Sequence, residues 1–197
     1  MASSTKMKLP KGMAVFPHLA RPDTKFNPLG IYKTLLAIPV KEAESILKEL
    51  AAVYKGHVGK VPAKSENTMW KMELDEETGE ETGRVLFKLN VKNVELKDGS
   101  IWDRKPKQFD AKLNQVQENI ATGSEIYANV ELYCWDAGGS KGVTLQPLAI
   151  QIVKLVAFGG GIDASSFGFE SVKDGFEGDM TVKEEPVSDE EEELDDF

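Results

Sequence analysis

Residues 126–135 read Ile-Tyr-Ala-Asn-Val-Glu-Leu-Tyr-Cys-Trp, and smaller, mostly apolar side chains alternate with larger polar or aromatic ones. The smaller, mostly apolar kind consists of Ile126, Ala128, Val130, Leu132 and Cys134. Because side chains of a strand point alternately to opposite sides, this period of two predicts a strand that buries the apolar face. The glycine-rich residues 136–142 predict a turn. The chain from Val143 to Phe158 then returns as a hairpin partner and is broken by the glycines at 159–161.

Two earlier segments share the strand signature, and the segment between them is helical. Residues 30–38 are rich in β-branched and aromatic side chains and stop at Pro39, whereas residues 84–92 alternate apolar with polar side chains. Over residues 41–55 apolar side chains recur at helical spacing, which predicts an amphipathic helix that ends at Gly56. The apolar stripe of this helix consists of Ala43, Ile46, Leu47, Leu50, Ala51 and Tyr54.

About five strands of moderate length and one helix, without βαβ alternation, predict a mainly β domain. The economical arrangement is a small, closed or nearly closed antiparallel barrel capped by the helix, since closure removes exposed strand edges. A β-sandwich is the alternative, and periodicity alone does not separate the two. Composition divides the chain into a folded domain at residues 1–161, a linker or dimer-contact segment at 162–183 and an acidic tail at 184–197.

The tail holds the net charge of the protein. It reads Glu-Glu-Pro-Val-Ser-Asp-Glu-Glu-Glu-Glu-Leu-Asp-Asp-Phe, with nine carboxylates and no Lys or Arg, and such a composition predicts disorder. The whole chain has 24 basic and 33 acidic side chains, so the chain without its tail is neutral. Residues 1–156, with 22 bases and 19 acids, have a net charge of +3. This is the charge layout of a protein that binds a polyanion and carries a mimic of it.

The sequence gives little support to catalysis, a cofactor or a membrane. His18 and His57 stand apart from any Cys or carboxylate at metal-ligand spacing, and the glycines at 159–161 lack the helix and Lys-Ser/Thr pair of a phosphate loop. No apolar run is long enough for a membrane span. Cys134 is the only cysteine, which excludes an intrachain disulfide and agrees with a reducing cytosol. We therefore expect no enzyme activity, no cofactor or metal, and no membrane partner.

Aromatic and basic side chains lie on the outward faces of the predicted strands. Tyr127, Tyr133 and Trp135 alternate with the buried face of residues 126–135, and an exposed ring can stack on any nucleobase. One more aromatic, Trp102, accompanies them. The basic side chains are Arg21, Lys25, Lys33, Arg84, Lys88, Lys92, Arg104, Lys105 and Lys107. Cations on phosphates together with rings on bases are the usual means of binding a single strand. The alternative is that the rings cover the barrel under the helix or a subunit contact.

Several short motifs follow one another in a fixed order. They are Ala-Arg-Pro-Asp at 20–23, Asn-Pro-Leu-Gly-Ile-Tyr-Lys at 27–33, Leu-Ala-Ile-Pro at 36–39, Tyr-Cys-Trp at 133–135, Val-Ala-Phe-Gly-Gly-Gly at 156–161 and Asp-Phe at 196–197. In this order the chain resembles the replication single-stranded DNA-binding proteins of short-tailed coliphages and their relatives, an OB-fold family. The match is looser over residues 55–125. It departs from the family pattern at Leu29, where the family carries a basic residue, and near Asn90, where the family tends to place an aromatic.

The resemblance implies a five-stranded OB-type barrel that binds single-stranded DNA without base preference. It also implies annealing of complementary strands and a role in phage DNA replication and recombination, in the cytoplasm of the infected bacterial host. The expected DNA-binding residues are Arg21, Lys33, Lys88, Lys92, Trp102, Lys105, Lys107, Tyr127, Tyr133 and Trp135.

The resemblance further implies that the tail recruits replication proteins, namely the phage DNA polymerase and helicase–primase. The expected contacts are Asp195, Asp196 and the terminal Phe197. A homodimer through the tail-proximal segment would give the aromatic residues there a partner; they are Phe167, Phe169 and Phe176. We also expect the tail to occupy the basic groove in the free protein and to become available to other proteins once DNA binds.

Two functions of other classes stay open. One is a protein-interaction module, such as a DNA mimic or chaperone, that acts through the acidic tail and never touches nucleic acid. It predicts tight binding to basic proteins and none to oligonucleotides. The other is an enzyme, which would need a cluster of titratable groups that the sequence does not provide.

Overall fold

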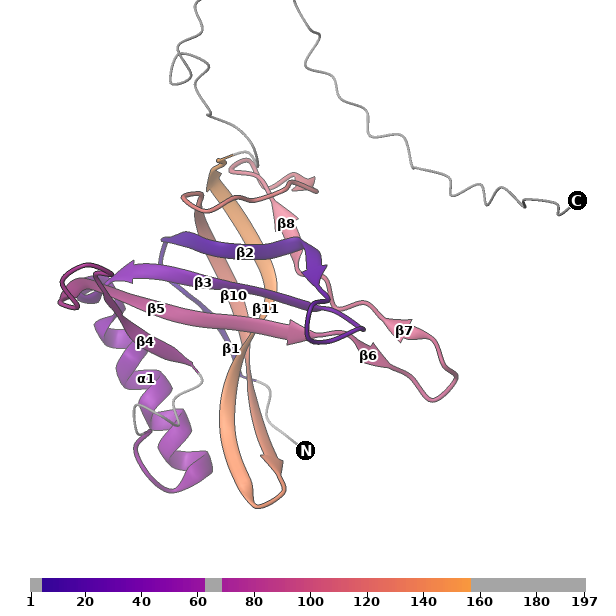
Figure 1. Cartoon of the computed structure of the whole chain (residues 1–197), viewed down its shortest axis with the longest axis horizontal. Coiled ribbons are helices and arrows are strands. Elements are labelled where there is room, and N and C mark those ends of the chain that lie inside the picture. The colour runs from indigo at the N-terminus through magenta and orange to yellow at the C-terminus, as the bar shows by residue number, and fades with distance from the viewer. Residues whose placement is uncertain (1–4, 63–68, 157–197) are drawn as a thin grey trace, which may run out of the picture. The chain divides into compact units, whose positions relative to one another are not determined.

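The structure, a computed structural model, describes residues 5–62 and 69–156 (Figure 1). In chain order its elements are β1 (Thr5–Lys8), β2 (Gly12–Asp23), β3 (Ile31–Pro39), α1 (Val40–Val58), β4 (Trp70–Leu74), β5 (Glu81–Lys92), β6 (Val94–Glu95), β7 (Ile101–Trp102), β8 (Lys107–Phe109), β9 (Gln115–Val116), β10 (Glu125–Ala137) and β11 (Ser140–Lys154). The mainly β fold with one helix is confirmed. The predicted strand end at Phe158 is wrong, because β11 ends at Lys154 and residues 155–156 are not in a strand. The linker at 162–183 and the tail at 184–197 lie outside the described residues.

Five strands close into a ring in the order β2, β3, β5, β11, β10 and back to β2. All neighbouring pairs are antiparallel except β5 and β11, which pair in parallel at Leu89 and Leu145. A closed ring with an odd number of strands cannot alternate direction at every pair, so one parallel contact is unavoidable. Figure 1 shows β2, β3 and β5 side by side across the longer β10 and β11.

The N-terminal strands β1 and β2 are absent from the sequence-based prediction. Both pair with the same edge of β10. β1 pairs with the middle of β10, and β2 pairs with its first residues, where Gly12 lies opposite Ile126. β2 is irregular, with a register shift between Val15 and His18 next to Pro17. Because a bulge interrupts the period of two and proline cannot donate to the ladder, this strand leaves little trace in the sequence pattern.

The apolar faces of the ring strands and of α1 meet in one core. Its most deeply buried members include Leu9, Ala14, Leu19, Leu36, Ile38, Leu50, Tyr54, Met69, Val85, Phe87, Leu89, Ile126, Ala128, Val130, Leu145 and Ile150. The predicted inward faces of residues 84–92 and 126–135 are therefore confirmed. Trp70 and Cys134 are half-buried and pack against this core.

α1 packs against β3, β5 and β11 and buries Ala43, Leu50 and Tyr54 as predicted. Its predicted end at Gly56 is wrong, because the helix continues to Val58. Gly59, with φ of 87°, ends it and donates its N–H to a carbonyl of the last turn, as left-handed C-caps do. The additional turn contains His57, which reaches the β10–β11 hairpin.

The β10–β11 hairpin extends past the ring as a two-stranded arm (Figure 1). Its strands join at the tightest possible turn, since Ala137 pairs with Ser140 and only Gly138 and Gly139 lie between. Both glycines have positive φ, 58° and 82°, as the two central residues of a type I′ turn require. The turn therefore fixes the register of the whole hairpin.

Gly12→Ala is expected to lower the free energy of unfolding by about 1–3 kcal/mol, because overpacking a well-filled site strains it. An added Cβ would lie 2.7 Å from the Ala37 carbonyl oxygen and 2.8 Å from Ile38 Cγ1. Urea unfolding measures the change. Gly56→Ala is the matched control: no heavy atom lies within 4 Å of its added Cβ, so it should raise stability by about 1 kcal/mol. Equal effects of the two substitutions would contradict this account.

Candidate functional site

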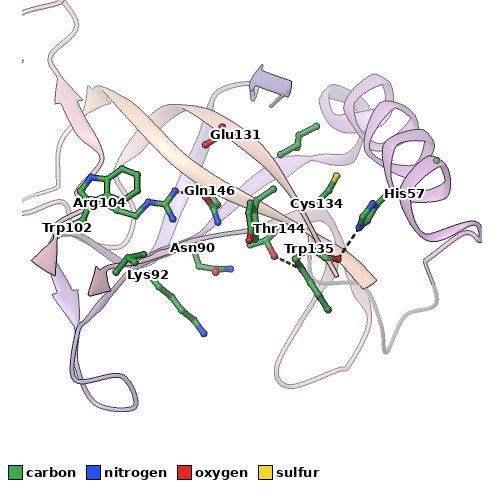
Figure 2. A pocket seen from close by; sticks show the side chains of 14 residues that line it. His57, Asn90, Lys92, Trp102, Arg104, Glu131, Cys134, Trp135, Thr144 and Gln146 are labelled. Carbon is green, nitrogen blue, oxygen red and sulfur yellow. Dashed lines mark hydrogen bonds between the residues drawn. The ribbon is translucent and has the colours of Figure 1, made fainter. Parts of the chain in front are cut away.

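A groove of about 1240 Å³ crosses the outer face of β5, β11 and β10 (Figure 2). Leu89 and Leu145 pair across β5 and β11 and point into the core. Their strand neighbours Asn90 and Gln146 therefore face outward and line the groove floor. Tyr133 continues this floor on β10, where it lies opposite Thr144 in the hairpin.

Trp135 is held rigidly at one end of the groove. Its indole lies on the backbone of Gly142, the residue opposite, where an added Cβ would be only 2.3 Å from Trp135 Cζ2. Its Nε1–H donates to Thr144 Oγ1 at 3.2 Å. Its carbonyl oxygen lies 3.0 Å from His57 Nε2, which donates to it in the tautomer protonated at that nitrogen (Figure 2). The ring and the backbone of this residue are therefore both fixed.

Trp102 and Arg104 form the opposite wall. The Arg104 guanidinium carbon lies 5.1 Å from the centre of the Trp102 ring, and its Nη2 donates to Gln146 Oε1 at 2.6 Å. Its backbone N–H donates to Oδ1 of the buried Asn93, whose Nδ2 donates to the carbonyl of Leu29. These bonds hold Arg104 over the floor and tie it to the loop that precedes β3.

A buried tyrosine anchors the same wall from beneath. Burial, together with a hydrogen bond to Asp103, raises the pKa of the Tyr32 phenol above its ordinary value. Tyr32 therefore remains neutral at physiological pH and holds the residue between Trp102 and Arg104 to β3.

The cations near the groove differ in their surroundings. Lys92 is exposed on the floor, and no other described residue forms an ion pair with it. Lys33 instead pairs with Asp23, and this hydrogen bond holds the pKa of Asp23 below its ordinary value. Burial, reinforced by the nearby charge of Lys71, lowers the pKa of Lys88. The charged side chains that line the groove are therefore Lys92 and Arg104, with Glu131 opposing them.

Four of the predicted site residues line this groove: Lys92, Trp102, Tyr133 and Trp135. Six others lie elsewhere on the described surface, namely Arg21, Lys33, Lys88, Lys105, Lys107 and Tyr127. Tyr127 is further along the outer face of β10, with Lys8 Nζ 4.4 Å from its ring centre. Asp195, Asp196 and Phe197 lie outside the described residues.

The structure also places residues at the groove that the sequence-based prediction lacks. Thr144 and Gln146 alternate with buried neighbours, so the hairpin register would have identified them as outward residues opposite Tyr133 and Glu131. His57 left no local signal, because its position depends on where α1 ends. Phe26 does not line the groove; it lies in the loop between β2 and β3, is 85% exposed, and has Lys25 Nζ 5.4 Å from its ring centre.

Within residues 5–62 and 69–156, no three His, Cys, Asp or Glu side chains gather closely enough to hold a metal ion. In the same part of the chain, the one helix is not apolar enough to cross a membrane.

Comparisons with known proteins show the fold. No family model matches the sequence, and no curated protein sequence matches it either. The structure is similar to gp2.5, a single-stranded DNA-binding protein of bacteriophage T7, with a TM-score of 0.60 and 21% identity over 90% of this chain and 100% of that chain. It is also similar to the single-stranded DNA-binding protein of bacteriophage Enc34 in complex with single-stranded DNA, with a TM-score of 0.56 and 14% identity over 76% of this chain and 86% of that chain. The predicted OB-type architecture is confirmed by these similarities and by the closed five-stranded ring.

Gly142→Ala is expected to displace the Trp135 indole and break its bond to Thr144, because the added Cβ would overlap the ring. The indole N–H resonance of Trp135, assigned by its loss in Trp135→Phe, should shift and exchange faster with solvent. Thr144→Val separates the two effects, since it removes the N–H acceptor but leaves the ring seated on Gly142; resonances of the ring C–H groups should therefore shift more in Gly142→Ala than in Thr144→Val. An unchanged Trp135 resonance in Gly142→Ala would show that the indole is not held by this contact.

Proposed function

We propose that the protein binds single-stranded DNA along this groove. The observation that carries the proposal is the gathering of three aromatic rings, Tyr133, Trp135 and Trp102, around a floor that also presents Lys92 and Arg104. Stacking of a base on a ring contributes roughly 1–3 kcal/mol and tolerates every base, and the cations accompany the phosphates.

The position of the groove on the fold supports the same function. OB-folds bind oligonucleotides on the face of their second and third strands and in the loops that follow the first and fourth strands. In this ring those strands are β3 and β5, and the loops are residues 24–30 and the β10–β11 turn. The groove lies between β5 and the hairpin, and Phe26 in the first loop offers a further ring for stacking.

The proposal extends to phage DNA replication and recombination in the cytoplasm of the infected host, with protection and annealing of single strands. Its support is the ordered set of sequence motifs and the fold shared with two phage single-stranded DNA-binding proteins. We propose that Asp195, Asp196 and Phe197 recruit the phage polymerase and helicase–primase, and that residues 162–183 support a homodimer. The groove has a binding role in this proposal and not a catalytic one.

Titration with oligo-dT should quench the intrinsic tryptophan fluorescence, because Trp135 and Trp102 both line the groove. Trp135→Ala should weaken binding roughly tenfold, as expected for the loss of one stacked base. Trp70→Phe is the control, since Trp70 packs against the core and should not alter affinity. If oligo-dT neither quenches the tryptophan fluorescence nor binds at low salt, the proposal is contradicted, and a module that binds proteins through its tail is favoured.

The same titration across a salt series tests the cations. Lys92→Gln should weaken binding of every oligonucleotide and lower the magnitude of the logarithmic salt slope by roughly 0.7, the contribution of one phosphate contact to a single strand. A slope unchanged by this substitution would exclude Lys92 as a phosphate ligand.

Deletion of residues 184–197 should raise affinity for oligo-dT at low salt, because it removes nine carboxylates that compete with phosphates for the basic groove. The gain should shrink as salt rises, since screening weakens the competing tail. Equal affinity and equal salt slope in the full-length and shortened proteins would show that the tail does not occupy the groove.

A further inference from the structure

The β6–β7 hairpin stands apart from the ring of strands. It forms a two-stranded sheet of its own, in which Val94 lies opposite Trp102 (Figure 1). Its exposed apolar side chains are Val94, Leu96, Ile101 and Trp102. Within the described residues, none of these four belongs to the buried core. Since a two-stranded hairpin is only marginally stable alone, and exposed apolar surface commonly marks an interaction site, we expect this hairpin to contact a partner.

The two faces of the β6–β7 hairpin differ in character. The Leu96 N–H donates across the hairpin at 2.8 Å, which extends the ladder of hydrogen bonds toward the turn. Because side chains alternate along a strand, Leu96 shares the face of Val94 and Trp102. Glu95 and its partner Ile101 occupy the opposite face. One face is therefore apolar and aromatic, and the carboxylate of Glu95 lies on the other.

The apolar face, formed by Val94, Leu96 and Trp102 and called here the β6–β7 face, continues the wall of the groove. Val94 and Trp102 line the groove, and Leu96 follows Val94 in the same row. A ligand that leaves the groove beside Val94 therefore meets Leu96 about 6.7 Å further on. The two groove cations, Lys92 and Arg104, flank the base of the hairpin in the chain.

Both ends of the β6–β7 hairpin are fastened to the barrel. Asn93, directly before β6, is buried, and its Nδ2 donates to the Leu29 carbonyl oxygen at 2.9 Å. Its Oδ1 accepts the backbone N–H of Arg104 at 2.9 Å. Asp103, directly after β7, accepts a hydrogen bond from the Tyr32 phenol of β3. The base of the hairpin is therefore ordered before a ligand binds, which lowers the entropic cost of contact.

We propose that the β6–β7 face is a further contact surface for single-stranded DNA, where Val94 and Leu96 pack against nucleotides that extend beyond the groove. This inference rests on the proposed function and lengthens the bound path. Bases and sugars offer apolar surface to this face, while phosphates meet Lys92 and Arg104 at its base. A strand on the opposite face would meet the carboxylate of Glu95 instead.

The test compares one apolar side chain from each face of the hairpin. Leu96, 44% exposed, and Ile101, 56% exposed, are each replaced by Thr in the full-length protein, since Thr favours strands and preserves the hairpin. Fluorescence anisotropy measures the dissociation constant of labelled oligo-dT of about 16 nucleotides, the upper end of the site size of one OB-fold. Leu96→Thr should weaken binding about fivefold, as the loss of a half-buried apolar contact predicts. Ile101→Thr, the matched control, should leave the dissociation constant unchanged.

Methyl resonances give a second measurement, which needs no substitution at the β6–β7 face. Saturation of the full-length protein with the same oligo-dT should shift the methyl signals of Leu96 and Val94 and leave those of Ile101 in place. Shifts as large at Ile101 as at Leu96, or no shift at any of the three, overturn the proposal.

Two results would overturn the role of the β6–β7 face while the groove stands. Equal weakening by Leu96→Thr and Ile101→Thr means that the hairpin acts only through its fold, and no weakening by Leu96→Thr means that DNA does not contact it. If Leu96→Thr instead changes the sedimentation of the DNA-free protein and leaves the affinity unchanged, a second copy of the chain occupies this face, which also overturns the proposal. If the unsubstituted protein binds no oligo-dT, the proposed function fails, and the role of the β6–β7 face with it.

Discussion

The register of the β10–β11 hairpin determines which of its side chains face the groove. A slip of one residue would turn Tyr133 and Trp135 into the core and expose Leu132 instead, because the side-chain period of a strand is two. Two features prevent such a slip: the two-glycine turn at one end of the hairpin, and the register shifts at Glu125/Ile126 and Asn129/Val130 further along β10. Burial of Val130, Leu132 and Leu145 makes any other register costly. The functional face is thus specified by the same pattern that builds the core.

The groove depends less on charge than the composition suggests. Residues 1–156 have a net charge of +3, but several cations are engaged within the protein, among them Lys33 with Asp23 and Lys11 with Glu125 at 2.7 Å. Such exposed pairs contribute little stability, but they offset positive charge that phosphates would otherwise meet. Of the cations in the described ranges, Lys92 and Arg104 line the groove. Stacking and hydrogen bonding therefore carry a large share of the proposed binding.

Sequence periodicity predicted the faces of regular strands and failed where the backbone is irregular. Residues 84–92 and 126–135 alternate without interruption, so their buried and outward sides follow directly. β2 is bulged next to a proline, and no local pattern marks it. The site was predictable only where its residues lie on those regular strands. The contribution of His57 depends on one additional helical turn, and that of Gln146 on the partner across the hairpin, which are relations between distant parts of the chain.

The two ends of the groove differ in how much freedom they leave a bound strand. Trp135 rests on Gly142 and has its N–H engaged by Thr144, so one face and the polar edge of its ring are occupied before any ligand arrives. A base that stacks on the remaining face meets a ring whose conformational freedom has already been lost, which lowers the entropic cost of binding. Tyr133, 51% exposed, is less enclosed and can adapt to bases of different size. A fixed ring with an adaptable ring next to it suits the proposed binding of bases of different size. The bonds that hold Trp135 and Arg104 in place therefore also restrict the side chains of Thr144 and Gln146 on the groove floor.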